Sequence, residues 1–345
     1  MTETRPAETE TRPDKTGSET RRMTTVQAIL DALDLSMAKD STVLLLGEDV
    51  SDPAGGGIFH TSAGLSAKYG ENRVRATPIS EQAIAGAAIG AAIGGFRPVA
   101  EIMFMDFFGI ALDQIANHAA KLRYMSGGQT AVPLTIRTAA GAGMQFGAQH
   151  SEMLESWVCH IPGLKVVVAA NPADAKGLLM SAIADDDPVI VIEPTLNYWT
   201  SGEVPVGEHF VPIGRAATAR PGSDVTVVTY GRMTGFALQA AGELAAEGID
   251  AEVIDLRSLV PMDEDAILAS VGRTRRAVIV HEAVRRGGLG AEIASLINEH
   301  LFGQLDAPVL RVAAPNTPVP YAAELEREFL VDAAKIAAGV REAVK

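Results

Sequence analysis

A carboxylate at the start of an apolar helix is the first candidate for chemistry in this chain. Glu81 follows the segment Thr77-Pro-Ile-Ser80 and precedes residues that are nearly all Ala, Gly and Ile. From local sequence alone, the favoured interpretation is structural, with Ser80 capping a helix and Glu81 complementing the helix dipole. The alternative is a carboxyl group at the edge of an apolar surface, where it is poised for proton transfer.

His150 is the second candidate, because it closes a glycine-rich segment, residues 138–150, that follows a strand-like run. Open α/β sheets bind their ligands in the loops that follow the strands. The segment lacks the spacing of a dinucleotide fingerprint or a P-loop, so it is a weak signal by itself. The other six histidines lie in less suggestive contexts, and none belongs to an HExxH metal motif.

The elements that must position these residues follow the pattern of a parallel α/β protein. Short apolar runs, without polar residues at every second position, alternate with helical patterns. This indicates strands that are covered by helices on both faces. The expected strands are residues 43–46, 99–104, 132–136, 166–169, 189–192, 225–229, 251–256, 277–280 and 309–312.

The chain of 345 residues is long enough for two domains. Residues 1–22 are almost wholly polar or charged, which predicts a disordered tail. A capping-box pattern at Thr24 and Gln27 then opens a helix and a first α/β domain, expected over residues 23–200. The polar stretch 201–212, which contains Gly and Pro, is the expected linker to a second α/β domain over residues 213–345.

Small residues recur every four positions in the helix that follows Glu81. Ala83, Ala87 and Ala91 alternate with Gly86, Gly90 and Gly94. A face of this kind lets another backbone approach closely. The sequence does not decide whether that backbone belongs to this chain or to a partner subunit.

Composition narrows the classes of partner. The formal net charge is −14, with 43 acidic and 29 basic residues, so nucleic acid and anionic membranes would be repelled. No apolar run is long enough to cross a bilayer, and the N-terminus is charged where a signal peptide needs an apolar run. The single cysteine, Cys159, excludes an internal disulfide framework and fits a reducing compartment. We therefore expect a cytoplasmic protein that binds neither nucleic acid nor membranes.

Six ordered motifs resemble the β subunits of the thiamine-diphosphate-dependent 2-oxo acid dehydrogenases, and the resemblance runs from about Thr24 to the C-terminus. The motifs are Leu46-Gly-Glu-Asp-Val50, Thr77-Pro-Ile-Ser-Glu81, Met105-Asp-Phe-Phe-Gly-Ile-Ala-Leu-Asp-Gln114, Gly147-Ala-Gln-His-Ser151, His160-Ile-Pro-Gly-Leu-Lys-Val-Val-Val168 and Thr317-Pro-Val-Pro-Tyr321. Residues 101–107 and 121–128 look closest to the acetoin dehydrogenase and bacterial pyruvate dehydrogenase branches.

The resemblance implies a transketolase-like fold. An N-terminal pyrimidine-binding domain with a parallel sheet would precede a smaller C-terminal α/β domain. Thiamine diphosphate would lie between subunits, and its diphosphate would be held through Mg²⁺ by a Gly-Asp-Gly motif of a separate α subunit. Because this chain contains no Gly-Asp-Gly, we expect it to bind the coenzyme poorly by itself.

The resemblance also reverses the interpretation of the two candidate residues. Glu81 would form a hydrogen bond to N1′ of the coenzyme's aminopyrimidine. Ile79, Met103 and Phe107 would line the aminopyrimidine pocket, and Phe107 would offer a ring face for stacking. His150 would lie at the mouth of the active site, where it would donate a proton or assist acyl transfer to lipoamide.

Members of the family often hold a structural K⁺ ion, mostly through backbone carbonyls. Asp187 stands where relatives frequently have Asn. From the residues alone, Asp185 to Pro188 is equally well interpreted as an exposed turn. The positions that match the family's potassium site are Leu134, Ala182, Ile183, Asp185 and Asp187.

The predicted function is one half of an α₂β₂ enzyme. It would act on pyruvate or another 2-oxo acid by oxidative decarboxylation, or cleave acetoin, and pass the acyl unit to a lipoyl acyltransferase core. A branched-chain 2-oxo acid is an alternative substrate, and a non-catalytic assembly subunit of the same fold is an alternative function. Retention of Glu81 and His150 argues against the assembly subunit. Length and the missing Gly-Asp-Gly argue against a complete homodimeric thiamine enzyme.

Overall fold

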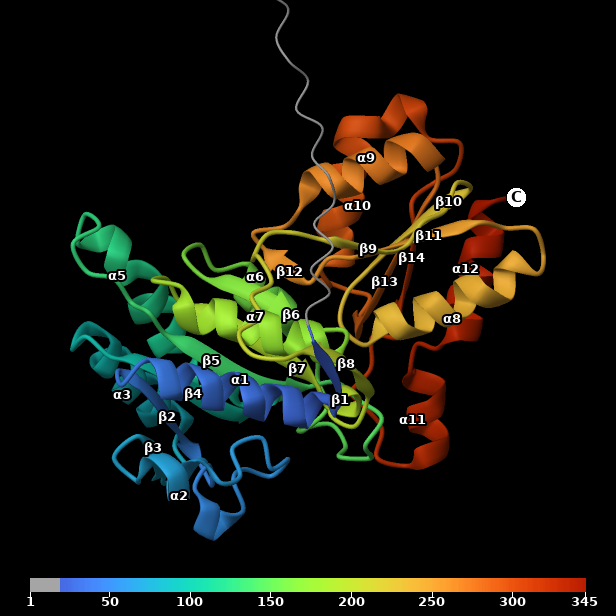
Figure 1. Cartoon of the computed structure of the whole chain (residues 1–345). Helices are drawn as coiled ribbons and strands as arrows, with labels where there is room; N and C mark the ends of the chain where they lie inside the picture. The colour runs from blue at the N-terminus through green and yellow to red at the C-terminus, as the bar shows by residue number, and fades with distance from the viewer. Residues whose placement is uncertain (1–18) are drawn as a thin grey trace, which may run out of the picture.

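Two α/β domains, each built on its own sheet, make up the described part of the chain. The structure is a computed structural model and describes residues 19–345 (Figure 1). The first domain has a seven-stranded sheet of order β12-β6-β7-β5-β4-β2-β3. The second has a five-stranded sheet of order β14-β13-β10-β11-β9.

The first sheet is parallel except at one edge, where β12 runs antiparallel to β6. Helices α1 and α7 pack on one face of the sheet, and α3 and α4 pack on the other. The strands are β2 (Val43–Glu48), β3 (Val74–Thr77), β4 (Arg97–Phe104), β5 (Thr135–Ala140), β6 (Lys165–Val168), β7 (Val189–Pro194) and β12 (Ser258–Val260). The helices are α1 (Thr25–Lys39), α2 (Leu65–Tyr69), α3 (Glu81–Ile93), α4 (Phe108–Asp113), the π-helical turn η3 (Gln114–Ala119), α5 (Ala120–Met125), α6 (Glu155–Cys159) and α7 (Pro172–Ala184).

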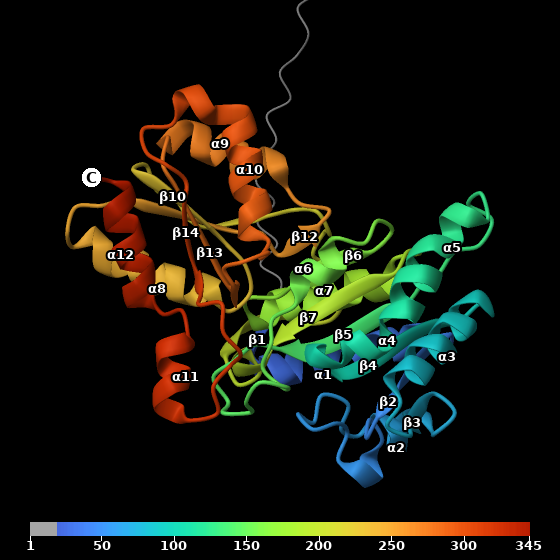
Figure 2. The same cartoon turned by 180° about the vertical axis from the view of Figure 1, so that it is seen from behind.

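The second sheet is also covered on both faces, by α8 and α12 on one side and by α9 and α10 on the other (Figure 2). Its strands are β9 (Ala217–Arg220), β10 (Val225–Thr229), β11 (Ala251–Asp255), β13 (Ala277–Val284) and β14 (Leu310–Ala314). The helices are α8 (Met233–Ala245), α9 (Glu264–Thr274), α10 (Gly290–Leu301), α11 (Ala323–Phe329) and α12 (Ala333–Ala343).

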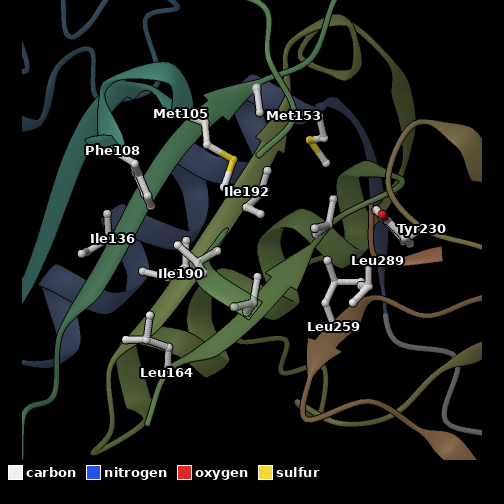
Figure 3. Packing of buried hydrophobic residues seen from close by; sticks show 14 of the residues in the cluster. Met105, Phe108, Ile136, Met153, Leu164, Ile190, Ile192, Tyr230, Leu259 and Leu289 are labelled. Atoms are coloured by element: carbon white, nitrogen blue, oxygen red, sulfur yellow. The ribbon is translucent and has the colours of Figure 1, made fainter. Parts of the chain in front are cut away.

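A continuous apolar core joins the two domains. Figure 3 shows Ile190 and Ile192 of the first sheet in the same buried cluster as Tyr230 and Leu289 of the second domain. A buried polar contact crosses the same boundary, because the Tyr230 hydroxyl donates a 2.6 Å hydrogen bond to Glu155. Burial raises the pKa of the Glu155 carboxyl to about 7, although the bond from Tyr230 opposes that shift. The domains are therefore packed against each other as one body.

Every strand predicted from an apolar run is present, with ends that shift by a few residues. The largest shift is in the run predicted over residues 132–136, because β5 begins at Thr135, two residues after Pro133. The predicted capping box is confirmed: Thr24 and Gln27 exchange hydrogen bonds at the start of α1. The expected capping of α3 by the Ser80 side chain is wrong, because that side chain accepts no capping hydrogen bond.

The predicted tail and linker contain a two-stranded sheet. β1 (Thr20–Thr24) pairs antiparallel with β8 (Ser201–Pro205), so residues 20–22 of the predicted tail and residues 201–205 of the predicted linker form strands. The pairing is fixed by backbone hydrogen bonds and by Met23, which packs in a small core with Val204. Residues 1–18 of the predicted tail lie outside the described residues.

Within residues 19–345, no helix combines the length and apolar character that a bilayer crossing requires.

A buried ion triad crosses the middle of the first sheet. The Arg137 guanidinium on β5 donates to Glu193 on β7 at 2.8 and 2.9 Å, and to Glu101 on β4 at 2.9 Å. Arg137 is 1% exposed. Burial opposes the Arg137 charge, but the two carboxylates outweigh it and raise the arginine pKa. The guanidinium thus holds the neighbouring strands β4, β5 and β7 in a fixed register.

We expect Arg137→Leu to destabilise the fold by about 3–5 kcal/mol, because it leaves two buried carboxylates side by side. The loss should be smaller at pH 5 than at pH 8. Burial already raises the pKa of Glu101 against the opposing charge of Arg137. Without the guanidinium, this carboxyl binds a proton in the folded state, so the stability of the variant falls as pH rises. Urea unfolding at both pH values measures this. Arg123→Leu, at an exposed ion pair, is the control and should change little; equal losses in the two variants would contradict the prediction.

Candidate active site

A cavity of about 670 Å³ opens at the carboxyl end of β2 and β4, where the strands of a parallel sheet present their loops. All five residues predicted to bind the coenzyme or take part in catalysis line this cavity. Ile79 comes from the segment before α3 and Glu81 from the first residue of α3. Met103 lies at the end of β4, Phe107 in the turn that follows β4, and His150 at the end of the glycine-rich loop.

Glu81 is the first residue of α3 and is 7% exposed. Among the described residues, its carboxylate has no hydrogen-bond donor and no cation within ion-pair distance. Glu48, at the end of β2, lines the same cavity. Burial raises the pKa of the Glu48 carboxyl, and the nearby charges of Asp49 and Glu81 raise it further. The site therefore places two carboxylates in apolar surroundings, where a ligand that donates hydrogen bonds is favoured.

An aromatic cluster forms the wall that carries His150. The centroid of the Phe104 ring lies 5.0 Å from His150 and 5.8 Å from Phe146, and Phe107 lies 5.2 Å from His150, all with edge-to-face geometry. Edge-to-face contact fixes the tilt of a ring as well as its position. The imidazole is therefore presented to the cavity in a defined orientation.

Seven cavity residues were not assigned from the sequence: Glu48, Ile58, Phe104, Ile110, Gln145, Phe146 and Tyr321. Glu48 and Tyr321 lie inside two of the six motifs, and Phe146 lies inside the glycine-rich segment. The family motifs therefore include Glu48 and Tyr321, although no role was predicted for either residue. Tyr321 is the contribution of the second domain to this cavity.

The rim of the cavity is apolar and exposed. Ile79 is 75% exposed, Tyr321 74%, Ile110 55% and Ile58 51%. The small-residue face of α3 continues from this rim, with Ala83, Ala87 and Gly90 exposed. A contiguous apolar rim next to a helix face of small residues is typical of a surface that another protein covers.

Two family models match almost the whole described chain. The transketolase pyrimidine-binding domain matches residues 21–200, and the transketolase C-terminal domain matches residues 214–336. The chain is 47% identical to the β subunit of acetoin:2,6-dichlorophenolindophenol oxidoreductase from Cupriavidus necator, over 94% of this chain and 98% of that one. It is 44% identical to the pyruvate dehydrogenase E1 β subunit of Porphyra purpurea, over 92% and 95% of the two chains. The 2-oxoisovalerate dehydrogenase β subunit of Bacillus subtilis is 43% identical, over 92% and 98%.

The chain belongs to the transketolase-like β subunits of 2-oxo acid and acetoin dehydrogenases. This confirms the predicted family and fold class. A solved structure described as a split-gene transketolase, an inactive beta4 tetramer, matches with a TM-score of 0.74 and 26% identity over 93% of this chain and 98% of that chain. The β-subunit family thus shares this two-domain α/β architecture with transketolases.

The residues that match the family's potassium site lie at the end of α7, in the turn that follows it, and at Leu134 just before β5, and side-chain cations lie next to several of them. Arg97 donates to the carbonyl oxygens of Ile183 at 3.2 Å and Asp185 at 2.9 Å. The carbonyls of Ala182 and Leu134 accept from backbone N–H groups of Asp185 and Val189.

The three carboxylates of this turn are also paired within the chain. Asp185 contacts Lys165 at 2.7 Å, Asp186 contacts Arg97 at 2.6 Å, and Asp187 contacts Arg123 at 2.5 Å. Burial opposes ionisation of Asp187, but Arg123 and Lys165 outweigh it and hold the pKa of Asp187 below its usual range. Each of the three carboxylates therefore has a side-chain cation beside it, and from this we expect a bound K⁺ to add little stability.

We expect thermal unfolding of the chain to be insensitive to the choice of monovalent cation. The melting temperature in KCl should match that in NaCl or choline chloride of equal ionic strength within about 1 °C, since a ligand stabilises only when it binds the folded state. Differential scanning calorimetry measures this. A rise of several degrees specific to potassium would instead show that the ion displaces Arg97 and binds the turn.

Proposed function

We propose that this chain is the β subunit of a thiamine-diphosphate-dependent acetoin or 2-oxo acid dehydrogenase component, and that it works as half of an α₂β₂ assembly. The observation that carries the proposal is the buried Glu81 carboxylate, which faces an apolar cavity without a described protein partner. The acetoin and pyruvate enzymes among the relatives support the substrate class. A branched-chain 2-oxo acid is the alternative that the 2-oxoisovalerate relative supports.

The cavity residues fit the aminopyrimidine of thiamine diphosphate. Glu81 would form a hydrogen bond with N1′ of the pyrimidine, because its buried carboxylate has no donor among the described residues and faces an apolar cavity. Ile79, Met103 and Phe107 would enclose the ring and exclude water. When bound, the coenzyme supplies the carbanion chemistry, and the protein orients and tunes it.

His150 would act on the substrate side of the cavity. Its ring is fixed by Phe104 and Phe107 at the cavity wall, and an imidazole transfers protons readily near neutral pH. We propose that it donates a proton to the reacting group or assists acyl transfer to a lipoyl group of an acyltransferase core.

The partner would complete the site. Within residues 19–345, no group of three or more His, Cys, Asp or Glu residues is arranged to hold a metal ion. A diphosphate needs Mg²⁺ and a carboxylate-bearing loop, so the α subunit would supply both and would cover the exposed rim and the small-residue face of α3. The lone Cys159 favours a reducing compartment such as the cytoplasm for such an assembly.

The test compares this chain alone, the chain co-expressed with its α subunit, and the same pair carrying Glu81→Gln. We expect dye reduction that depends on acetoin, pyruvate or a branched-chain 2-oxo acid only in the wild-type pair. Glu81→Gln should lower kcat by about 10²–10⁴-fold, since the amide cannot share a proton with N1′.

Glu71→Gln is the matched control, because Glu71 is an exposed carboxylate of the same domain and should leave kcat unchanged. Activity of the chain alone, or an assembled Glu81→Gln pair with full activity, would overturn the proposal. An assembled wild-type pair that turns over none of these substrates would favour the non-catalytic assembly subunit instead.

A further inference from the structure

The glycine-rich loop that leads to His150 has an unusual backbone path. Gly141, Gly143 and Gly147 have positive φ angles of 97°, 112° and 74°, and Gln145, which is not glycine, has φ of 56°. A non-glycine residue in the left-handed region persists where surrounding contacts hold it there. This path turns several backbone N–H groups of one short segment toward the second domain.

Glu326 on α11 receives two of those N–H groups. Its carboxylate accepts from the N–H of Gly143 at 2.8 Å and from the N–H of Gln145 at 3.2 Å. Glu326 is 3% exposed. In the part of the chain that the structure describes, no Lys, Arg or His lies within ion-pair distance of it. Backbone N–H groups therefore take the role that a cation usually plays beside a buried carboxylate.

A second carboxylate of the same domain completes the contact. Glu282 on β13 accepts from the N–H of Ala142 at 3.0 Å, and Arg232 donates to the Ala142 carbonyl at 3.1 Å. A Cβ atom at Gly141 would lie 2.6 Å from Glu282 Oε1, so glycine is required for this approach. Residues 141–145 are thus held along their backbone by side chains of the C-terminal domain.

The contact reaches the cavity at both ends. On the loop side, Phe146 is the residue after Gln145 and His150 follows four residues later, and both line the cavity. On the other side, Tyr321 lies five residues before Glu326, lines the same cavity, and stands 3.4 Å from where a Cβ of Gly147 would be. Figures 1 and 2 both show α11 beside the loops that follow β5.

We propose that Glu326 is a positioning residue for the candidate active site. Its carboxylate fixes the glycine-rich loop by accepting the N–H groups of Gly143 and Gln145, and this places Phe146 and His150 at the cavity wall. The catalytic consequence rests on the function proposed above, whereas the ordering of the loop does not. The C-terminal domain therefore sets the geometry of a site that lies mainly on the other domain.

The first test is hydrogen exchange of this chain alone. Glu326→Gln removes the negative charge that strengthens both bonds, and its NH₂ group cannot accept the bond that Gln145 also makes to the second carboxylate oxygen. We expect the amides of residues 142–147 to exchange about tenfold faster than in the wild type, with the rest of the C-terminal domain unchanged. Glu328→Gln is the control, because Glu328 is an exposed carboxylate on the same helix and should leave the loop unchanged. Wild-type exchange of the loop in Glu326→Gln would overturn the proposal, as would faster exchange throughout the C-terminal domain.

The second test uses the complex with the α subunit. Glu326→Gln should lower kcat by about tenfold or more while the KM for thiamine diphosphate stays within about twofold, because the predicted aminopyrimidine contacts lie outside the loop. Glu326→Asp is the second variant, which keeps the charge but shortens the side chain by one methylene and should show the same split. Full activity in both variants would overturn the catalytic role. If loop exchange responds but the wild-type pair is inactive, the loop contact stands and the proposed function fails.

Discussion

The geometry of the first domain depends on the buried ion pairs that the Arg137 guanidinium forms with Glu101 and Glu193. The guanidinium fixes the central strands β4, β5 and β7 relative to one another, close to the edge where the cavity opens. Burying two carboxylates for one guanidinium is unfavourable unless each oxygen finds a donor. The Tyr198 hydroxyl meets part of that need with a 2.7 Å bond to Glu193. The centre of the domain is thus polar and tightly specified within an otherwise apolar core.

This polar centre is coupled to the cavity through aromatic rings. Tyr198 packs against Phe59 at 4.5 Å, Phe59 meets Phe104 at 6.0 Å, and Phe104 meets His150 at 5.0 Å. Each contact fixes one ring relative to the next. The position of the His150 imidazole therefore depends, through Phe104 and Phe59, on Tyr198 and the buried ion triad that Tyr198 contacts. Glu81, by contrast, is held by the start of α3 and by the apolar residues around it. The two candidate groups are therefore positioned by independent parts of the fold.

The sequence predicted the central strands because strands buried on both faces need long apolar runs. The coenzyme roles of Ile79, Glu81, Met103 and Phe107 came instead from the family resemblance, since local sequence alone favoured a structural role for Glu81. The short strands β1, β3, β8, β9 and β12 were missed because none of them carries a long apolar run. The role of Glu326 is invisible in sequence because it depends on contact between residues more than 180 positions apart. Tertiary contacts of this kind leave no local pattern.

The small strand β12 has a consequence for how this kind of protein is assembled from modules. Its residues, Ser258–Val260, lie well beyond the first family domain in the sequence, yet they form the outermost strand of that domain's sheet, beside β6. A fragment ending between the two family domains would lack β12 and leave the apolar strand β6 as an unpaired edge, which is a template for pairing with other chains. The first family domain therefore completes its sheet only when the second is joined to it in the same chain, and separating the two is expected to promote aggregation.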